Sequence, residues 1–336
     1  MISNKTSFIL FIIFFNISAT VFSKYLGFNI SGLFVGSILG MGLFFIDEGY
    51  FVLVDKIFKF LLYLNLIMLV NNLFFADYFI IPPLFSSPDE TYNKTIIRAI
   101  NIFGNEFRMR RTTGLSDNIH VSSLLNLILC YILWVKNQKA MYYIASGVLF
   151  FSMNMQFVLI YFIWIGIRAR DLKFNFKTLL LLVSSLFLLF FLVDFFILDS
   201  AYYYQIISSG SEILLNDLKT YYDAQTVKSF FFGIKPGDID DPYDRSLGYY
   251  LPLTDIGIIG IPIQFGIVGL ISILLMSIFW LTYAKKRERK FILPLFFSAI
   301  HYFSLASFLG VLFITWIVRF PPKLKTRSIV TGVSKI

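Results

Sequence analysis

Long apolar stretches alternate with short basic segments along this chain, and the alternation predicts helices that cross a membrane. A spanning helix needs ~20 mostly apolar residues, because about 30 Å of hydrocarbon divides by a rise of about 1.5 Å per residue. Six stretches fit that length: Ser7–Ser23, Leu26–Ile46, Ile57–Ala76, Asn118–Val135, Thr178–Leu198 and Ile256–Tyr283. The last is long enough to tilt, or to break near Pro262.

Two further stretches, Met141–Ile167 and Phe291–Val318, are too long for one upright helix and short for two. Basic residues flank both stretches on each side, and short basic loops stay on the cytoplasmic side of a membrane. We therefore expect each stretch to be a hairpin of two short helices, turning near Ser152–Gln156 and near His301–Ser307. One long helix in each place is the alternative.

With two hairpins, the fold class is an all-α, polytopic transmembrane bundle of about ten helices with both termini in the cytoplasm. The whole chain, residues 1–336, is then one integral membrane domain. Two long polar segments, 77–117 and 199–250, face outward as periplasmic loops. A signal peptide is the alternative for the first helix, but its apolar run has the length of a span and no clear small-x-small cleavage site.

Composition supports the same class. Of 336 residues, 57% are hydrophobic and 15% charged, whereas soluble domains carry roughly 25% charged residues. A soluble globule of this size could not bury so much apolar surface. The high apolar and low charged content also excludes a disordered chain. The net charge of +9 fits basic cytoplasmic loops rather than a nucleic-acid partner. One cysteine, two histidines and no nucleotide-binding glycine pattern predict neither a metal site nor a cofactor.

The first outer segment gathers arginines. Arg108, Arg110 and Arg111 fall within four positions, and Gly114 and His120 follow as the chain re-enters the membrane. Guanidinium groups beside lipid are unfavourable unless they meet counter-charge, and arginine suits bidentate contact with phosphate oxygens. The cluster therefore indicates a phosphate-bearing ligand near the bilayer surface, or else contact with lipid head groups or with acidic residues of the loop.

The second outer segment carries four aspartates near Arg245 and Tyr249. The aspartate spacing lacks the glycine and the terminal glutamate of an EF-hand, which favours a solvated acidic turn over a calcium site. Paired tyrosines, Tyr249 among them, would stack on sugar rings or form an interfacial aromatic belt.

Asp255 precedes a very apolar, glycine-rich helix. A carboxylate there caps a helix N-terminus, yet partial burial would also raise its pKa and make it a candidate general base. His120 is a lone histidine, a residue type that is more often a hydrogen-bonded packing group than a catalyst.

Three motifs carry a resemblance to a known family. Arg111-Thr-Thr-Gly114 precedes a helix, Ser229-Phe-Phe-Phe-Gly233-Ile-Lys-Pro-Gly237 lies in the second loop, and Thr254-Asp255-Ile-Gly257 leads to Phe265-Gly266-Ile-Val-Gly269-Leu270. In these motifs and in its organisation the chain resembles the Wzy-type O-antigen polymerases of the O-antigen polymerase and ligase superfamily. Ligases usually carry a His-Asn pair where this chain has Thr254-Asp255.

The resemblance implies a multi-pass protein of the bacterial inner membrane, active on its periplasmic face. Such enzymes join undecaprenyl-pyrophosphate-linked glycan repeats, and they work with a flippase and a chain-length regulator of the same pathway. It implies catalytic roles for Arg111 and Asp255. Substrate-binding roles then go to the following residues: Arg108, Arg110, His120, Arg245 and Tyr249.

Three other functions compete with polymerisation. Ligation is disfavoured because this chain lacks the His-Asn pair that ligases usually carry. Peptidoglycan-type polymerisation by a related membrane fold stays open. A flippase or exporter of lipid-linked oligosaccharide would place ionisable residues near the bilayer midplane. In this chain the polar residues collect in the two outer segments instead, which favours chemistry at the membrane surface.

Overall fold

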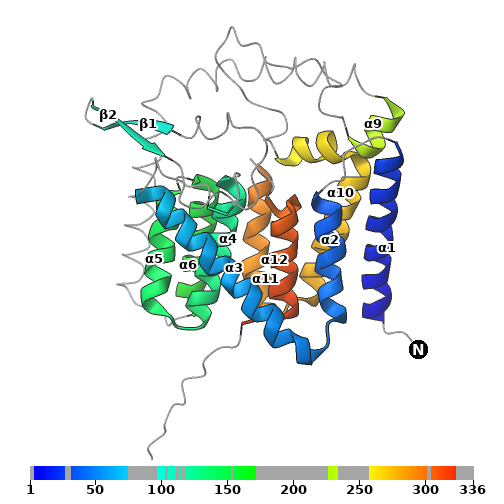
Figure 1. Ribbon diagram of the computed structural model, residues 1–336, viewed down its shortest axis with the longest axis horizontal. Coiled ribbons are helices and arrows are strands. Elements are labelled where there is room, and N and C mark those ends of the chain that lie inside the picture. Colours follow the sequence, from blue (N-terminus) through cyan, green and yellow to red (C-terminus); the bar gives the residue numbers. More distant parts are fainter. Residues whose placement is uncertain are drawn as a thin grey trace, which may run out of the picture.

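The computed structural model describes residues 4–26, 32–74, 97–102, 105–110, 114–115, 119–152, 154–171, 226–233, 257–300 and 304–322. Helices dominate this part of the chain, as the sequence predicts, and most stand side by side in a bundle (Figure 1). They are α1 (Asn4–Tyr25), α2 (Gly32–Gly42), α3 (Glu48–Phe74), α4 (Ile119–Val135), α5 (Lys139–Phe151), α6 (Met155–Asp171), α9 (Val227–Phe232), α10 (Gly257–Tyr283), α11 (Lys286–Ile292) and α12 (Phe308–Arg319), with 3₁₀ turns η1 (Leu43–Phe45), η4 (Leu293–Ile300) and η5 (Ser304–Ala306).

The two stretches that are too long for one helix, Met141–Ile167 and Phe291–Val318, are each divided, as the basic residues on their flanks predict. Helices α5 and α6 form the first hairpin and meet at Ser152–Asn154. The second stretch contains η4 and α12 as separate elements, with η5 (Ser304–Ala306) between them inside the expected turn His301–Ser307. Residues 301–303 of that turn lie outside the described residues. The first arm of this second pair is a 3₁₀ helix rather than an α-helix.

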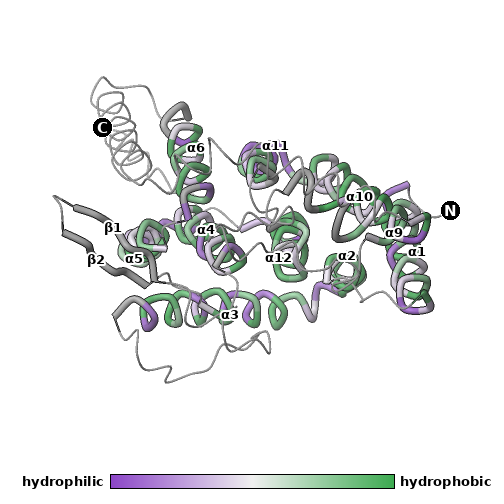
Figure 2. The backbone as a smooth tube through the Cα atoms, turned by 90° about the horizontal axis from the view of Figure 1, so that it is seen from above, coloured by the Kyte–Doolittle hydropathy of each residue, from purple (hydrophilic) through white to green (hydrophobic). Residues whose placement is uncertain are grey.

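Helix α12 lies at the centre of the bundle, between α2, α4 and α10 in the view from above (Figure 2). Every residue from Leu309 to Val318 except Leu312 is buried. Helix α2 approaches it closely because Gly36 and Gly40 have no side chain. A Cβ added to Gly36 would lie 2.9 Å from the Phe308 carbonyl oxygen. Small residues at a helix contact allow this approach in membrane bundles.

Polar side chains inside the bundle join neighbouring helices in pairs. The Ser272 hydroxyl donates to Asn16 Oδ1 at 2.6 Å and links α10 to α1, while Asn126 Nδ2 donates to the Ala145 carbonyl at 2.8 Å and links α4 to α5. Each buried polar group that finds such a partner avoids the desolvation penalty of an unpaired one. These bonds therefore fix which helices are adjacent.

Helix α10 is broken inside its apolar run. Gly266 has φ 61° and ψ −167°, values that no α-helix contains. The segment before the break crosses the end of the bundle, and the segment after it runs along α1 and α2 (Figure 1). The expected break is present, four residues beyond Pro262.

One β-hairpin stands outside the all-α prediction. Strands β1 (Ile97–Ile102) and β2 (Asn105–Arg110) pair antiparallel, with Ala99 opposite Arg108 and Ile97 opposite Arg110. Because alternate residues of a strand share a face, Arg108 and Arg110 occupy one face of the hairpin. Arg98 and Phe107 occupy the other. The hairpin lies above the end of α5 at the edge of the bundle (Figure 1).

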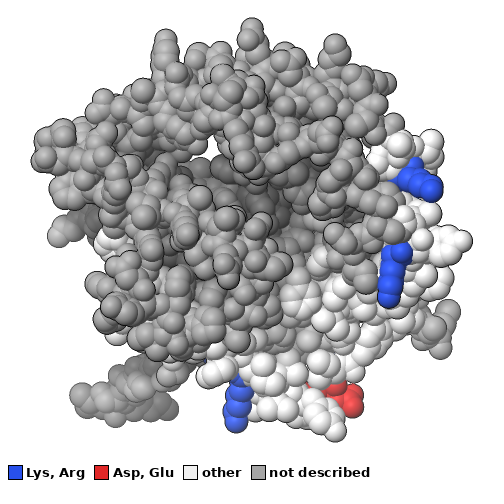
Figure 3. Space-filling model, turned by 45° about the horizontal axis from the view of Figure 1, so that its top comes forward, with Lys and Arg blue, Asp and Glu red and all other residues white. Residues whose placement is uncertain are grey.

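Two helical segments of the described chain are long and apolar enough to cross a membrane, Asn4–Tyr25 and Phe265–Tyr283. Five shorter apolar helices accompany them. Large apolar side chains are also exposed on outer helices, such as Phe14 on α1 and Phe60 on α3, which are 71% and 64% exposed. Figure 3 shows that the described part of one face carries only scattered Lys or Arg side chains and one acidic patch, with uncharged surface between them. This apolar surface suits association with a membrane.

Candidate functional site

The candidate site lies at the end of the bundle where α4 begins. The backbone N–H of Leu115 donates to Asn65 Oδ1 at 3.0 Å, and Asn65 Nδ2 donates to the Ser122 carbonyl at 3.2 Å. Asn65 belongs to α3 and is 0% exposed. One buried amide thus uses both of its ends to hold the loop before α4, and the first turn of α4, against α3.

Gly114 is the position that lets this loop approach. Its φ of 64° lies in the left-handed region, which glycine adopts without steric penalty. A Cβ at Gly114 would lie 2.5 Å from Asn65 Oδ1 and 2.8 Å from the Ser122 hydroxyl. The glycine of the Arg111-Thr-Thr-Gly114 motif therefore has a structural reason in this chain, and the loop conformation depends on it.

Replacing Gly114 with alanine is expected to lower the free energy of unfolding by about 1–3 kcal/mol, because a side chain is strained at this φ and the buried Asn65 amide has no room to move. Thermal melting of the purified protein in detergent measures the change. The matched control is Gly147→Ala in α5, where an added Cβ meets nothing within 4 Å. A Gly114→Ala protein as stable as the Gly147→Ala protein would contradict the packing described here.

His120, the second residue of α4, contacts the turn between α5 and α6. Its Nδ1 lies 3.0 Å from Asn154 Nδ2 and 3.4 Å from Gln156 Nε2. Both neighbours are amide nitrogens, which only donate, so Nδ1 accepts and carries no proton in this arrangement. The histidine joins α4 to the α5–α6 turn, as a packing histidine does. A role in binding substrate stays a prediction.

The structure describes the predicted arginines only in part. Arg108 and Arg110 share one face of the β-hairpin through the strand register. The other predicted site residues, Arg111, Arg245, Tyr249 and Asp255, lie outside the described residues.

Two of the sequence motifs contact each other. A Cβ at Gly266, the break in α10, would overlap the carbonyl group of Phe231 and the backbone nitrogen of Phe232 in α9. Helix α9 is fixed by a capping box in which Ser229 N donates to the Thr226 hydroxyl at 3.1 Å and Thr226 N donates to the Ser229 hydroxyl at 2.7 Å. The aromatic run of the second loop therefore rests on the glycine break that follows Asp255 by eleven positions.

Sequence reasoning did not identify Asn65 or Asn154, which turn out to position the site. Asn65 carries a usable signal, since it is a polar residue in the middle of the apolar stretch Ile57–Ala76, and such residues need an internal partner. Asn154 lies in a turn that was expected, but nothing in the sequence indicates that His120 is its neighbour.

The chain matches no protein-family model, and neither a curated protein nor a solved structure matches it. The site therefore has to be interpreted from its own residues and from the motifs in the sequence.

Proposed function

We propose that this protein is a polytopic membrane glycosyltransferase that polymerises a surface polysaccharide from glycan repeats linked to undecaprenyl pyrophosphate. The observation that carries the proposal is the anchoring of the loop before α4, through Asn65 and Gly114. That loop follows Arg111 directly, and the hairpin that contains Arg108 and Arg110 precedes it.

The proposed reaction joins two lipid-linked glycans. A sugar hydroxyl of one glycan attacks the anomeric carbon of the other, and the bond from that carbon to the pyrophosphate oxygen breaks. The bonding electron pair leaves with the pyrophosphate, whose growing negative charge is stabilised by Arg110, Arg111 and Arg245. Asp255 accepts the proton of the attacking hydroxyl. Fixed charges accelerate a reaction most where the transition state develops charge, and this is the role that we propose for these residues.

The proposed topology places the arginine-rich loop on the periplasmic side of the bacterial inner membrane. Basic residues gather at the opposite end of the bundle, where α1 begins, α6 ends and α12 ends: Lys5, Arg168 and Arg319. Short basic segments remain in the cytoplasm. The exposed apolar side chains of α1 and α3 then face lipid.

Deleting the gene and examining the cell-surface polysaccharide tests the function directly. Loss of polymerisation leaves one repeat unit attached to the lipid A core, which is the expected result. Polymer that accumulates on its lipid carrier, with no repeats attached to the lipid A core, would indicate a ligase instead. Single units trapped on the cytoplasmic leaflet would indicate a flippase, and either outcome would refute the proposal.

Two substitutions of Asp255 separate its two possible roles. If Asp255 accepts the proton, Asp255→Asn and Asp255→Ala should both lose polymer, because an amide is no base. If it only caps the helix, Asp255→Asn should keep polymer, since asparagine caps nearly as well as aspartate. Polymer length on a gel, compared at equal protein abundance, is the measurement. Full-length polymer from Asp255→Asn would exclude the base.

A further inference from the structure

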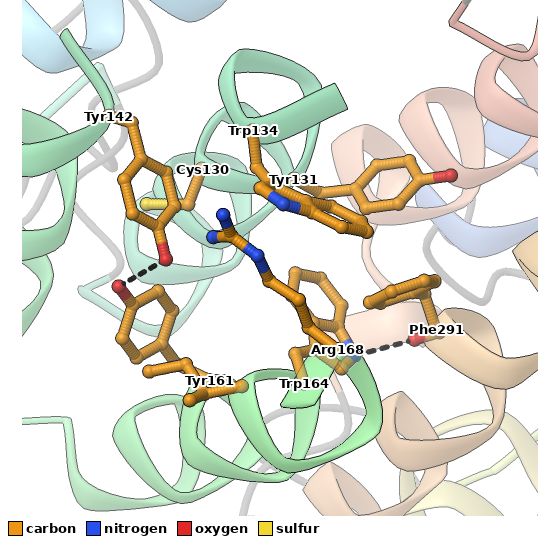
Figure 4. A pocket seen from close by; sticks show the side chains of 9 residues that line it. Cys130, Tyr131, Trp134, Tyr142, Tyr161, Trp164, Arg168 and Phe291 are labelled. Atoms are coloured by element: carbon orange, nitrogen blue, oxygen red, sulfur yellow. Dashed lines mark hydrogen bonds between the residues drawn. The ribbon is translucent and has the colours of Figure 1, made fainter. Parts of the chain in front are cut away.

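A small cavity lies at the end of the bundle opposite the candidate site. It has a volume of ≈ 20 Å³ and is enclosed mainly by aromatic side chains of α4, α5, α6 and α11 (Figure 4). Its lining includes Tyr131 and Trp134, Tyr142, Trp164 and Phe291, together with Arg168. A single water needs about 10–15 Å³, so the cavity has no room for a sugar ring or a nucleotide. Only a small polar group can enter it.

Arg168 extends into this aromatic enclosure from the last turns of α6. Its guanidinium group lies between the rings of Trp134 and Tyr142 (Figure 4), 5.1 Å and 5.9 Å from their centroids. Cation–π contact holds the group in place without using its N–H donors, which lie in the plane of the guanidinium.

A second guanidinium group, from Arg287 of α11, lies 5.0 Å from the same Trp134 centroid. Both guanidinium groups therefore contact the same indole ring. Their distances to its centroid place the two positive charges at most about 10 Å apart. Among the residues that the structure describes, neither arginine forms a hydrogen bond or an ion pair with a protein group. Their N–H donors are therefore available to a ligand or to solvent.

The nearby hydroxyl groups bond to one another, and none of them bonds to either arginine among the described residues. The Tyr161 hydroxyl donates to Ser146 Oγ at 2.8 Å and lies 2.7 Å from the Tyr142 hydroxyl, which therefore donates to it. Ser146 donates in turn to the Tyr142 carbonyl at 2.7 Å. These three groups are occupied with one another.

One carboxylate, Glu288, is close in sequence to Arg287, and it is 4% exposed. It forms no ion pair with either arginine in the described part of the chain, and its Oε2 has no hydrogen-bond partner there. Helix α11 contains four basic residues and this one carboxylate, so the excess of positive charge favours an anionic ligand.

We propose that Arg168 and Arg287 bind the phosphodiester group of an anionic phospholipid of the cytoplasmic leaflet. Planar guanidinium donors match phosphate oxygens bidentately. One phosphate oxygen would enter the cavity beside Arg168, whereas Arg287 contacts Trp134 and is not part of the cavity lining. A lipid is favoured over free phosphate because α5 presents apolar side chains next to Tyr142. Tyr143 and Ile144 are 68% and 49% exposed, and acyl chains would lie along them.

Lipid retention by the purified full-length protein tests this site without any assay of transferase activity. The protein is reconstituted in nanodiscs of phosphatidylcholine with phosphatidylglycerol, released into detergent, and its bound lipid is counted by native mass spectrometry. Replacing both arginines (Arg168→Gln with Arg287→Gln) should weaken phosphatidylglycerol binding by about tenfold or more, since one charge-assisted contact is worth about that factor.

The matched control is Arg289→Gln, on the same helix as Arg287. Arg289 already donates to the carbonyl groups of Ala284 and Thr282, both at 2.9 Å, so its loss should leave lipid binding unchanged. If the double variant does not fold, Arg287→Lys takes its place. This substitution keeps the charge but loses the planar fork, so the variant should bind lipid more weakly than the native protein.

Equal retention of phosphatidylglycerol in all these proteins would overturn the proposal. A second arm adds inorganic phosphate to the detergent-released protein. If phosphate bound in an arginine-dependent way while phosphatidylglycerol did not, the site would take free phosphate and the lipid assignment would be wrong.

Discussion

Arg111→Ala is expected to abolish polymer while the protein stays at normal abundance. Removing one fixed donor from a developing negative charge typically slows a reaction about 10²–10³-fold, and a polymer of many repeats meets that loss at every transfer. The residue follows the hairpin and precedes the anchored Gly114, so its backbone position should survive the substitution. Gel analysis of surface polysaccharide and an immunoblot of the membrane fraction measure the two quantities.

Arg98→Ala supplies the matched control. Arg98 has the same charge and belongs to the same loop, but the strand register places it on the hairpin face opposite to Arg108 and Arg110. Its loss should leave polymer length nearly unchanged. If Arg111→Ala still produced full-length chains, or if Arg98→Ala failed equally, specific contact between Arg111 and pyrophosphate would be refuted.

The second large effect is expected at Gly266. Gly266→Ala places a methyl group on the Phe231 carbonyl, which is backbone and cannot rotate away. Its φ of 61° with ψ of −167° is a conformation essentially restricted to glycine, which adds about 1–3 kcal/mol, and displacing a packed segment adds about 1–3 kcal/mol. We expect the amount of folded protein in the membrane to fall, with a lower melting temperature in detergent.

Gly49→Ala is the comparison for Gly266, because an added Cβ at Gly49 meets nothing within 4 Å. It should be as abundant as the native protein. A Gly266→Ala protein that melts at the native temperature would show that α9 does not rest on the break in α10.

The helices that the sequence predicted best are those whose apolar runs have clear polar limits. Asn118–Val135 was expected and Ile119–Val135 is helical. The α5–α6 hairpin followed from basic flanks alone, although no glycine or proline marks its turn. Helix α3 begins at Glu48, nine residues before the expected Ile57, and the Asp55–Lys59 pair, one turn apart, lies across the expected start.

Other elements depend on contacts that no local pattern reveals. The expected span Leu26–Ile46 contains the shorter α2, whose Gly36 is explained only by Phe308 on the distant α12. The β-hairpin was not expected, although polar and apolar residues alternate over Glu106–Arg110, which form most of β2.

The residues of the candidate site also differ in how far the sequence predicts them. Gly114 was found from its motif, and its positive φ explains the motif. The Asn65 bond to Leu115 joins positions fifty residues apart, and a single sequence gives no means of pairing them. Arg111 and Asp255 stay predictions, since both lie outside the residues that the structure describes.

The shortness of α5 has a consequence for the lipid around it. Its 13 residues extend about 20 Å, well below the ~30 Å of an average hydrocarbon layer. The similarly short α12 is enclosed by other helices, but α5 is at the edge, so under the proposed topology the bilayer has to thin beside it. The hairpin with Arg108 and Arg110 lies above that same edge. A polyprenyl carrier that approaches there would meet a dimple in the outer leaflet, with its diphosphate lowered toward the enzyme.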